Sequence, residues 1–277
     1  MILNKKLWIL SGVLVLALAV ALSGCGGKSE DAKKKTEAKK IIKVGATAGP
    51  QAQVLEAVKP VLAKEGIEMQ IVEFNDYATP NIALSQGDID ANSMQHRPYL
   101  EAQIAARDYK LTAIGQTVLL PMGLYSKKVK NLAELQEGAT VAIPNDPSNG
   151  GRGLLLMQKE GLIKLKPEAG ILPGPKDVIE NPKKLKIVEV EAAQAPRVLD
   201  DVDLVAVNTN YAIVVGLVPT KDSLALEGKD SPYACVIVVK TQDKDKADLQ
   251  KLLKAYQSPE VAQFIEKEFK GSILKAW

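Results

Sequence analysis

The sequence has few of the side chains that bind transition metals. Its 277 residues include one histidine, His96, and two cysteines, Cys25 and Cys235. One imidazole with one or two thiols supplies too few soft ligands for a zinc or other transition-metal site. We therefore expect no metal site and no cofactor.

The signatures of nucleotide binding and of thiol catalysis are also missing. The loop Gly45–Pro50 lacks the spacing of a dinucleotide fingerprint, and the helix expected after it, at 51–65, offers an N-terminus that suits an anionic group. Cys235 and His96 could face one cleft and support acyl transfer, but no oxyanion-hole or nucleophile motif accompanies the cysteine. We expect no catalytic residue, with a thiol enzyme as the alternative.

The N-terminus predicts an export signal. Lys5 and Lys6 precede a mostly apolar run that ends in Leu22-Ser-Gly-Cys25. Small residues directly before a cysteine resemble a lipobox, so we predict a lipoprotein signal peptide at 1–24 and lipid, such as palmitate, on the Cys25 thiol. The protein would then be anchored by acyl chains to the extracytoplasmic face of the cell membrane. Cys235 would have no disulfide partner. An uncleaved membrane anchor is the alternative.

The basic charge of the chain belongs to its first 40 residues. The signal peptide carries two lysines, and residues 26–40 carry six lysines against three acids, so these segments account for +2 and +3. The whole chain has a net charge of +3, which leaves −2 for 41–277. A weakly acidic body has no concentrated basic face, so we expect no nucleic-acid partner. Residues 25–40 are polar and predict a flexible tether.

The body alternates buried strands with helices, the pattern of an α/β fold. After the extended segment 121–126 the alternation restarts at Asn131, and 231–240 is again extended. We predict two domains, 41–120 with 236–277 and 121–235, with hinge crossings near 121 and 235.

Residues 87–100 are the first candidate ligand wall. Ile89–Ala91 reads as a short buried strand, and Met94, His96 and Tyr99 follow it. Polar groups at the carboxyl end of a strand lie where open α/β sheets bind ligands. The alternative is a strand–loop–helix junction in which the histidine forms its hydrogen bonds within the protein.

Arg152 is the second candidate. It follows the turn-rich Pro144–Gly153 and is expected in the first turn of a helix at 154–160, where a cation opposes the helix dipole unless it meets an anion. The alternative is a solvated arginine paired with a nearby acid.

Eight motifs, in this order along the chain, resemble those of the NlpA lipoprotein family. They are Phe-Asn-Asp-Tyr, Gly-Asp-Ile-Asp-Ala-Asn, Gln-His-x-Pro-Tyr-Leu, Gly-Leu-Tyr-Ser-Lys-Lys, Val-Ala-Ile-Pro-Asn-Asp-Pro, Asn-Pro-Lys-x-Leu-Lys-Ile, Leu-Asp-Asp and Asn-Tyr-Ala. The resemblance covers 41–277 and implies a two-domain periplasmic-binding-protein-like (type II) fold with two crossing strands and a central ligand cleft. It also implies a monomeric receptor that delivers an amino acid, most simply methionine, to the permease and ATPase subunits of an ABC importer.

The resemblance implies a ligand-binding role for eight residues. Tyr77, Met94, His96 and Tyr99 would line the side-chain slot, Arg152 would bind the ligand carboxylate, and Asn208, Asn210 and Cys235 would lie nearby. A bidentate cation suits a carboxylate, and aromatic walls suit a thioether.

Two positions depart from the family pattern. Met94 stands where an aromatic residue is usual, and Cys235 stands where the family has an asparagine that grips the amino-acid moiety. Because a thiol is a weak hydrogen-bonding group, Cys235 should hold a zwitterion less well. L-Methionine, D-methionine, a methionyl dipeptide and another amino acid stay open as ligands, and a surface adhesin or scaffold is the alternative outside the receptor class.

Overall fold

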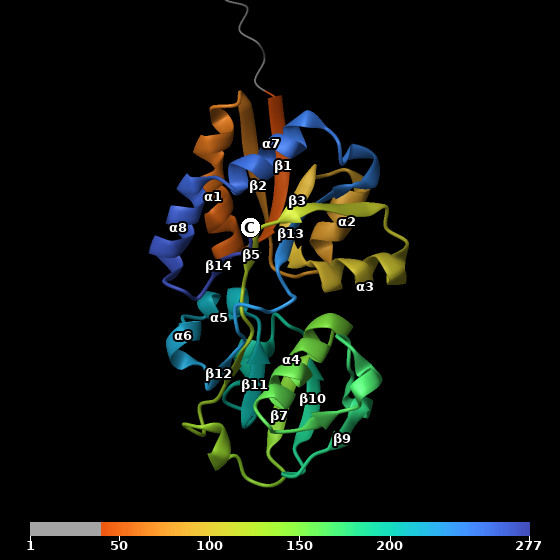
Figure 1. Ribbon diagram of the computed structural model, residues 1–277, viewed down its shortest axis with the longest axis vertical. Helices are drawn as coiled ribbons and strands as arrows, with labels where there is room; N and C mark the ends of the chain where they lie inside the picture. The colour runs from red at the N-terminus through yellow and green to blue at the C-terminus, as the bar shows by residue number, and fades with distance from the viewer. Residues whose placement is uncertain (1–39) are drawn as a thin grey trace, which may run out of the picture. The chain divides into compact units, whose positions relative to one another are not determined.

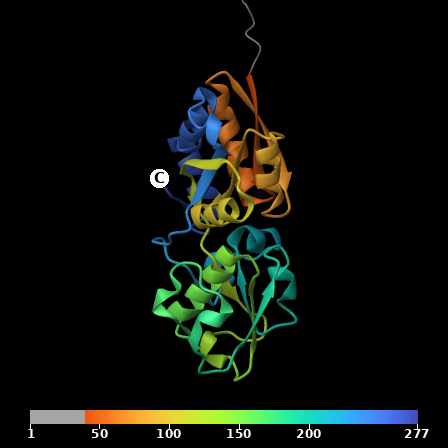
Figure 2. The same ribbon diagram turned by 90° about the vertical axis from the view of Figure 1, so that its right-hand side faces the viewer.

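The computed structural model describes residues 40–277, which form an α/β fold built on two five-stranded sheets (Figures 1 and 2). The strands of the first sheet, in spatial order, are β2 (Ile67–Phe74), β1 (Lys40–Thr47), β3 (Ala91–His96), β13 (Cys235–Lys240) and β4 (Leu111–Gln116). Those of the second sheet are β10 (Lys186–Val190), β7 (Thr140–Pro144), β11 (Leu204–Val207), β6 (Gly123–Tyr125) and β12 (Ala225–Leu226).

Two connections join the sheets. The chain leaves the first sheet after β4 and enters the second at β6, so residues 117–122 form the first crossing. It returns between β12 and β13, so residues 227–234 form the second crossing. Within the first crossing, β5 (Val118–Leu119) pairs with β14 (Leu274–Lys275) near the end of the chain. β8 (Lys164–Leu165) and β9 (Val178–Glu180) form a separate ribbon.

Helices cover both faces of the first sheet. Strand β13 divides its side chains between them: Cys235, Ile237 and Val239 lie in the cluster under α1 (Pro50–Ala63), α7 (Ala247–Tyr256) and α8 (Pro259–Phe269). Val236 and Val238 point to the other face, beneath α2 (Thr79–Gln86) and α3 (Arg97–Arg107). This alternation is the period-two pattern of a strand buried on both faces.

The second sheet is covered in the same way. Helix α4 (Pro147–Lys159) packs on one face with its buried leucines. Helix α5 (Thr209–Val214) and a 3-10 turn at Ala195–Val198 pack on the other, and α6 (Pro219–Asp222) follows α5. Residues Leu132–Glu134, just after the restart of the pattern at Asn131, form a 3-10 turn.

The strand predicted at Ile89–Ala91 is displaced. Residues 88–90 form a bend, and β3 begins at Ala91. The six residues of β3 are mostly polar and all buried. Because they are polar, the pattern of hydrophobic residues did not indicate a strand there. The buried amides are satisfied by one another, because Asn81 of α2 exchanges hydrogen bonds of 2.6 to 2.9 Å with Asn92 and Gln95.

The placement of Arg152 in a first helical turn was wrong. Helix α4 begins at Pro147, capped by Asp146, so Arg152 is its sixth residue and the helix-dipole argument does not apply. The glycines that suggest a turn serve close packing: a Cβ on Gly150 would lie 2.6 Å from the Pro144 carbonyl oxygen, and one on Gly151 would lie 2.9 Å from Pro173. Glycine is needed in this helical segment because nothing larger fits there.

Candidate functional site

All eight predicted site residues line one pocket between the two sheets. The space without protein atoms in and in front of the pocket is about 340 Å³, open solvent included. Its lining comprises the predicted residues Tyr77, Met94, His96, Tyr99, Arg152, Asn208, Asn210 and Cys235, and four others, Gln51, Gln95, Leu120 and Asn149. Tyr77 is half-buried, and the other seven predicted residues are each at most 6 % exposed. The motifs, which are far apart along the chain, therefore meet in one cluster.

Neighbouring positions on β3 and β13 of the first sheet line the pocket. Met94 and His96 are two residues apart on β3, so their side chains share a face of that strand, and His96 is in register with Cys235 of β13. Gln51, at the start of α1, donates a hydrogen bond of 2.9 Å from its Nε2 to the Met94 carbonyl oxygen. The helix start that the sequence singled out thus contributes an amide side chain to the pocket.

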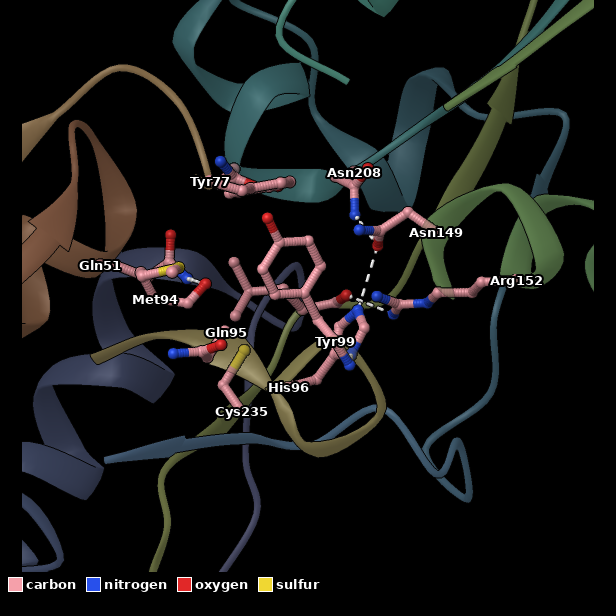
Figure 3. A pocket seen from close by; sticks show the side chains of 12 residues that line it. Gln51, Tyr77, Met94, Gln95, His96, Tyr99, Asn149, Arg152, Asn208 and Cys235 are labelled. Atoms are coloured by element: carbon pink, nitrogen blue, oxygen red, sulfur yellow. Dashed lines mark hydrogen bonds between the residues drawn. The ribbon is translucent and has the colours of Figure 1, made fainter. Parts of the chain in front are cut away.

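His96 is held as a neutral imidazole. Its Nδ1 accepts a hydrogen bond of 3.1 Å from the Tyr99 backbone N–H, so the ring hydrogen belongs on Nε2, 3.1 Å from Asn149 Oδ1 (Figure 3). Burial, and secondarily the Arg152 charge, lower the pKa of His96 to about 3. His96 therefore acts as a fixed hydrogen-bond donor.

Asn149 links the second sheet to this imidazole. Its Nδ2 donates to both carboxylate oxygens of Asp146, at 3.1 and 2.9 Å, which leaves Oδ1 facing the pocket. Oδ1 then accepts from Asn208 Nδ2 at 2.7 Å as well as from His96. Asn149 was not predicted as a site residue. Asp146 and Asn149 lie three residues apart, the spacing of a helix cap, and this pattern could have indicated Asn149.

Arg152 is buried and ion-paired. Its Nε donates to Glu227 Oε1 at 2.8 Å, and its Nη2 donates to Glu227 Oε2 and, at 2.8 Å, to the Leu120 carbonyl oxygen. The guanidinium carbon lies 4.6 Å from the centre of the Tyr233 ring. The alternative in which this arginine pairs with an acid is thus observed, although the arginine is buried rather than solvated.

Tyr77 and Tyr99 form the aromatic wall of the pocket, and Tyr211 contacts Tyr77 from outside the lining. The Tyr77 ring lies 5.8 Å from Tyr99 and 4.9 Å from Tyr211, measured between ring centres. Tyr77 follows β2 of the first sheet and Tyr211 belongs to α5, and the Tyr77 hydroxyl donates a hydrogen bond of 2.6 Å to Asn210 Oδ1. Burial raises the pKa of Tyr77 well above its usual value, so its hydroxyl stays a donor.

Two buried amide atoms in the pocket lack a protein partner. Among residues 40–277, Asn208 Oδ1 and Asn210 Nδ2 make no hydrogen bond. The orientation of each amide is set by its other end, because Asn208 Nδ2 donates to Asn149 and Asn210 Oδ1 accepts from Tyr77. An unpaired buried polar atom costs about 1–3 kcal/mol, so these two mark places where a ligand would form hydrogen bonds.

Cys235 faces the pocket as a neutral thiol. Burial raises its pKa to about 12, and Arg152 lowers it only in part. A nucleophilic cysteine needs a lowered pKa and a basic partner. Cys235 has neither in the described residues, because the low pKa of His96 makes this imidazole a weak base and its Nδ1 lone pair already accepts from the Tyr99 N–H.

Three further predictions concern metal binding, membrane crossing and the N-terminal segments. Within residues 40–277 no three His, Cys, Asp or Glu side chains gather as metal ligands. No helix of that part combines the length and apolar character needed to cross a membrane. The signal peptide, the lipidation site Cys25 and the predicted tether up to residue 39 lie outside the described residues, whereas Lys40, predicted as the last residue of the tether, begins β1.

Known proteins resemble this chain in both sequence and fold. A family model described as NlpA lipoprotein matches residues 42–277. The D-methionine-binding lipoprotein MetQ of Salmonella typhimurium is 50% identical over 94% of this chain and 94% of its own. A nutrient-binding protein of Burkholderia cenocepacia, solved bound to methionine, has a TM-score of 0.83 and 53% identity, covering 85% of this chain and all of that one. A periplasmic substrate-binding protein of an ABC transporter from Coxiella burnetii has a TM-score of 0.82 and 50% identity, with coverage of 85% and 100%. The predicted binding-protein fold is confirmed.

Proposed function

Because the chain belongs to the NlpA lipoprotein family, we propose that it is a lipid-anchored receptor that binds methionine for an ABC importer. The observation that carries the proposal is the set of polar atoms that the protein leaves unused in its pocket. Asn208 Oδ1 is an acceptor and Asn210 Nδ2 a donor, both buried. The hydrogen bonds of Arg152 to residues 40–277 use Nε and Nη2, so Nη1 is also unused.

These atoms complement a free amino acid. An α-ammonium group has only donors and matches Asn208 Oδ1, whereas an α-carboxylate has only acceptors and matches Arg152 Nη1 and Asn210 Nδ2. Met94 and the tyrosine wall leave an apolar, polarizable slot for the side chain, which suits a thioether. The names of the relatives, among them a D-methionine-binding lipoprotein and a methionine-bound protein, agree with this ligand class.

The domain organisation belongs to the same proposal. We place one domain at 41–120 with 236–277, the other at 121–235, and the hinges near 121 and 235. The two crossings support this, because they are the two chain segments that lead from one five-stranded sheet to the other. Closure over a ligand would bring Tyr77 against Asn210 and His96 against Asn149, pairs that are already hydrogen-bonded here.

Lipid on Cys25 would hold the receptor on the extracytoplasmic face of the cell membrane, where it would meet the permease and, through it, the ATPase. A monomer is sufficient for this role, because the pocket is lined by one chain. We propose no catalytic activity, because an imidazole with a pKa near 3 is too weak a base to activate a thiol with a pKa near 12.

Cys235 favours a second version of the same function, a receptor with changed specificity. Its thiol stands where the family pattern has an amide, and it lines the pocket itself. Another amino acid, D-methionine or a methionyl dipeptide would then be the preferred ligand.

Calorimetry on protein that has been unfolded, dialysed and refolded to remove bound solute tests the proposal. L-Methionine, D-methionine, methionyl dipeptides and L-leucine are titrated into the same preparation. We expect a one-to-one complex with methionine, tighter than with leucine. Tighter binding of another ligand in the panel would favour changed specificity, and no binding by any of them would refute the amino-acid receptor.

A further inference from the structure

Glu227 lies outside the pocket lining and is hydrogen-bonded to Arg152, the charged residue of that lining. It begins the second crossing, and its carboxylate pairs with Arg152 through Nε and Nη2. Its Oε2 also accepts a hydrogen bond of 2.9 Å from the Met122 backbone N–H in the first crossing. The pair is well shielded from solvent, with side-chain exposures of 3 % for Arg152 and 10 % for Glu227.

These contacts determine which part of Arg152 a ligand can meet. A guanidinium has five N–H groups: one on Nε and two on each terminal nitrogen. Nε is taken by Glu227, and Nη2 by Glu227 and the Leu120 carbonyl oxygen. Only the two hydrogens of Nη1 are left for a ligand. Glu227 therefore fixes the guanidinium in one orientation, in which a single nitrogen, Nη1, is left to donate hydrogen bonds to a ligand.

The same contacts cancel the only formal charge in the pocket lining. Arg152 is the one lysine, arginine, aspartate or glutamate among the twelve lining residues, and His96 is neutral. Glu227 beside it cancels this charge. Asp146, which lies outside the lining and whose carboxylate accepts from the Asn149 amide, caps α4, where the helix dipole offsets its charge. A buried ion needs a compensating partner, so a ligand with a net charge would be bound without one.

We infer that Glu227 is a positioning and specificity-determining residue, which aims Arg152 Nη1 at the ligand and makes the pocket select molecules of zero net charge. This inference rests on the proposed amino-acid function and adds a requirement on the charge of the ligand. The ligand must carry both its ammonium and its carboxylate, so the deaminated acid and the amide of the same amino acid should both be rejected.

Three ligands with the same thioether chain test the inference. They are L-methionine, which is a zwitterion, 4-(methylthio)butanoate, which is an anion, and L-methioninamide, which is a cation near neutral pH. Their dissociation constants are measured by calorimetry for the wild-type protein, for Glu227→Gln and for Asp230→Asn. Asp230 is the matched control, because it is an exposed carboxylate three residues further along the same crossing.

Removal of the Glu227 charge should move the two charged ligands in opposite directions. In Glu227→Gln the preference for L-methionine over the anion should shrink by about tenfold or more, because the unpaired Arg152 gains from a carboxylate. The preference over the cation should grow by a similar factor. Asp230→Asn should change neither ratio. A purely structural role for Glu227 would instead weaken all three ligands by one common factor, and that result, like unchanged ratios, would overturn the inference.

The conservative variant Glu227→Asp keeps the test decisive where Glu227→Gln does not fold. Because its charge is retained, its ligand ratios should stay within about threefold of wild type even where its affinities fall, and a larger change would contradict the inference. Wild-type protein that binds the anion as tightly as L-methionine would overturn it without any variant. Wild-type protein that binds none of the three ligands refutes the proposed function instead, so the two failures are distinguishable.

Discussion

Cys235 and His96 lie directly opposite each other on β13 and β3, and both side chains face the pocket. The pair looks like a nucleophile and its base, but both pKa values are shifted in the direction opposite to what catalysis needs. Burial holds the thiol protonated, with a pKa of about 12, and the imidazole neutral, with a pKa of about 3. The two residues instead form a neutral part of the pocket.

Replacement of Cys235 by asparagine should strengthen L-methionine binding if methionine is the ligand. The amide restores one or more hydrogen bonds, each worth about 0.5–1.5 kcal/mol, or up to about 3 kcal/mol to a charged group. At about 1.4 kcal/mol per decade, the gain is several-fold to about a hundredfold in Kd. Calorimetry measures it, with Cys235→Ser as the control for loss of the sulfur alone. An asparagine variant that binds methionine no better, beside a wild type that binds another solute tightly, would mean that the specificity has changed.

Sequence patterns located the pocket more accurately than they located its secondary structure. Met94, His96 and Tyr99 were grouped correctly, yet β3 was displaced because its residues are polar and their burial depends on amide pairing with Asn81. The glycines at 150 and 151 predict a turn by composition, whereas here they allow close packing of α4. Glu227 could not be found, since its partner Arg152 is 75 residues away and no local pattern connects the two.

The free energy of unfolding should depend strongly on both members of the Arg152–Glu227 pair. Arg152→Ala leaves Glu227 without its partner, which typically costs about 3–5 kcal/mol for a buried pair. The double replacement Arg152→Met/Glu227→Met removes both charges and should recover most of that loss. Urea unfolding of ligand-free protein compares them. A double variant no more stable than Arg152→Ala would show that the loss comes from packing rather than from the unpaired charge.

Acid should destabilise the protein partly through His96. Its pKa is about 3 when folded and about 6.5 when unfolded. Between these values only the unfolded state binds the proton, so stability falls as the pH falls, by up to about 1.4 kcal/mol per pH unit from this group. His96 is the only histidine of the chain. His96→Gln should therefore flatten the slope of unfolding free energy between about pH 6.5 and 5, and an unchanged slope would contradict the neutral, buried imidazole.

A methyl group at position 150 should disrupt the start of α4. In Gly150→Ala the new Cβ would approach the Pro144 carbonyl oxygen to 2.6 Å, so the backbone must shift. Overpacking of this kind costs about 1–3 kcal/mol, and the shift would move Asn149 beside it. Gly228→Ala is the matched control, because a Cβ added to Gly228 would have no other atom within 4 Å. Thermal unfolding should separate the two variants, and equal stabilities would contradict the close packing.

Lipid attachment should depend on Cys25. The motif Leu22-Ser-Gly-Cys25 predicts acylation of this thiol, so Cys25→Ser should abolish fatty-acid labelling and leave an uncleaved precursor. Cys235→Ser controls for loss of the chain's other thiol and should be labelled normally. Label that persists in Cys25→Ser would refute the lipoprotein assignment for this chain.

The identity of the bound molecule tests the central claim most directly. Native mass spectrometry of the protein, purified without added ligand, followed by mild unfolding and identification of the released compound, requires no assumption about affinity. We expect a one-to-one complex whose small molecule is methionine. Release of a solute other than an amino acid, or a preparation that is loaded with such a solute and is not displaced by methionine, would contradict the account.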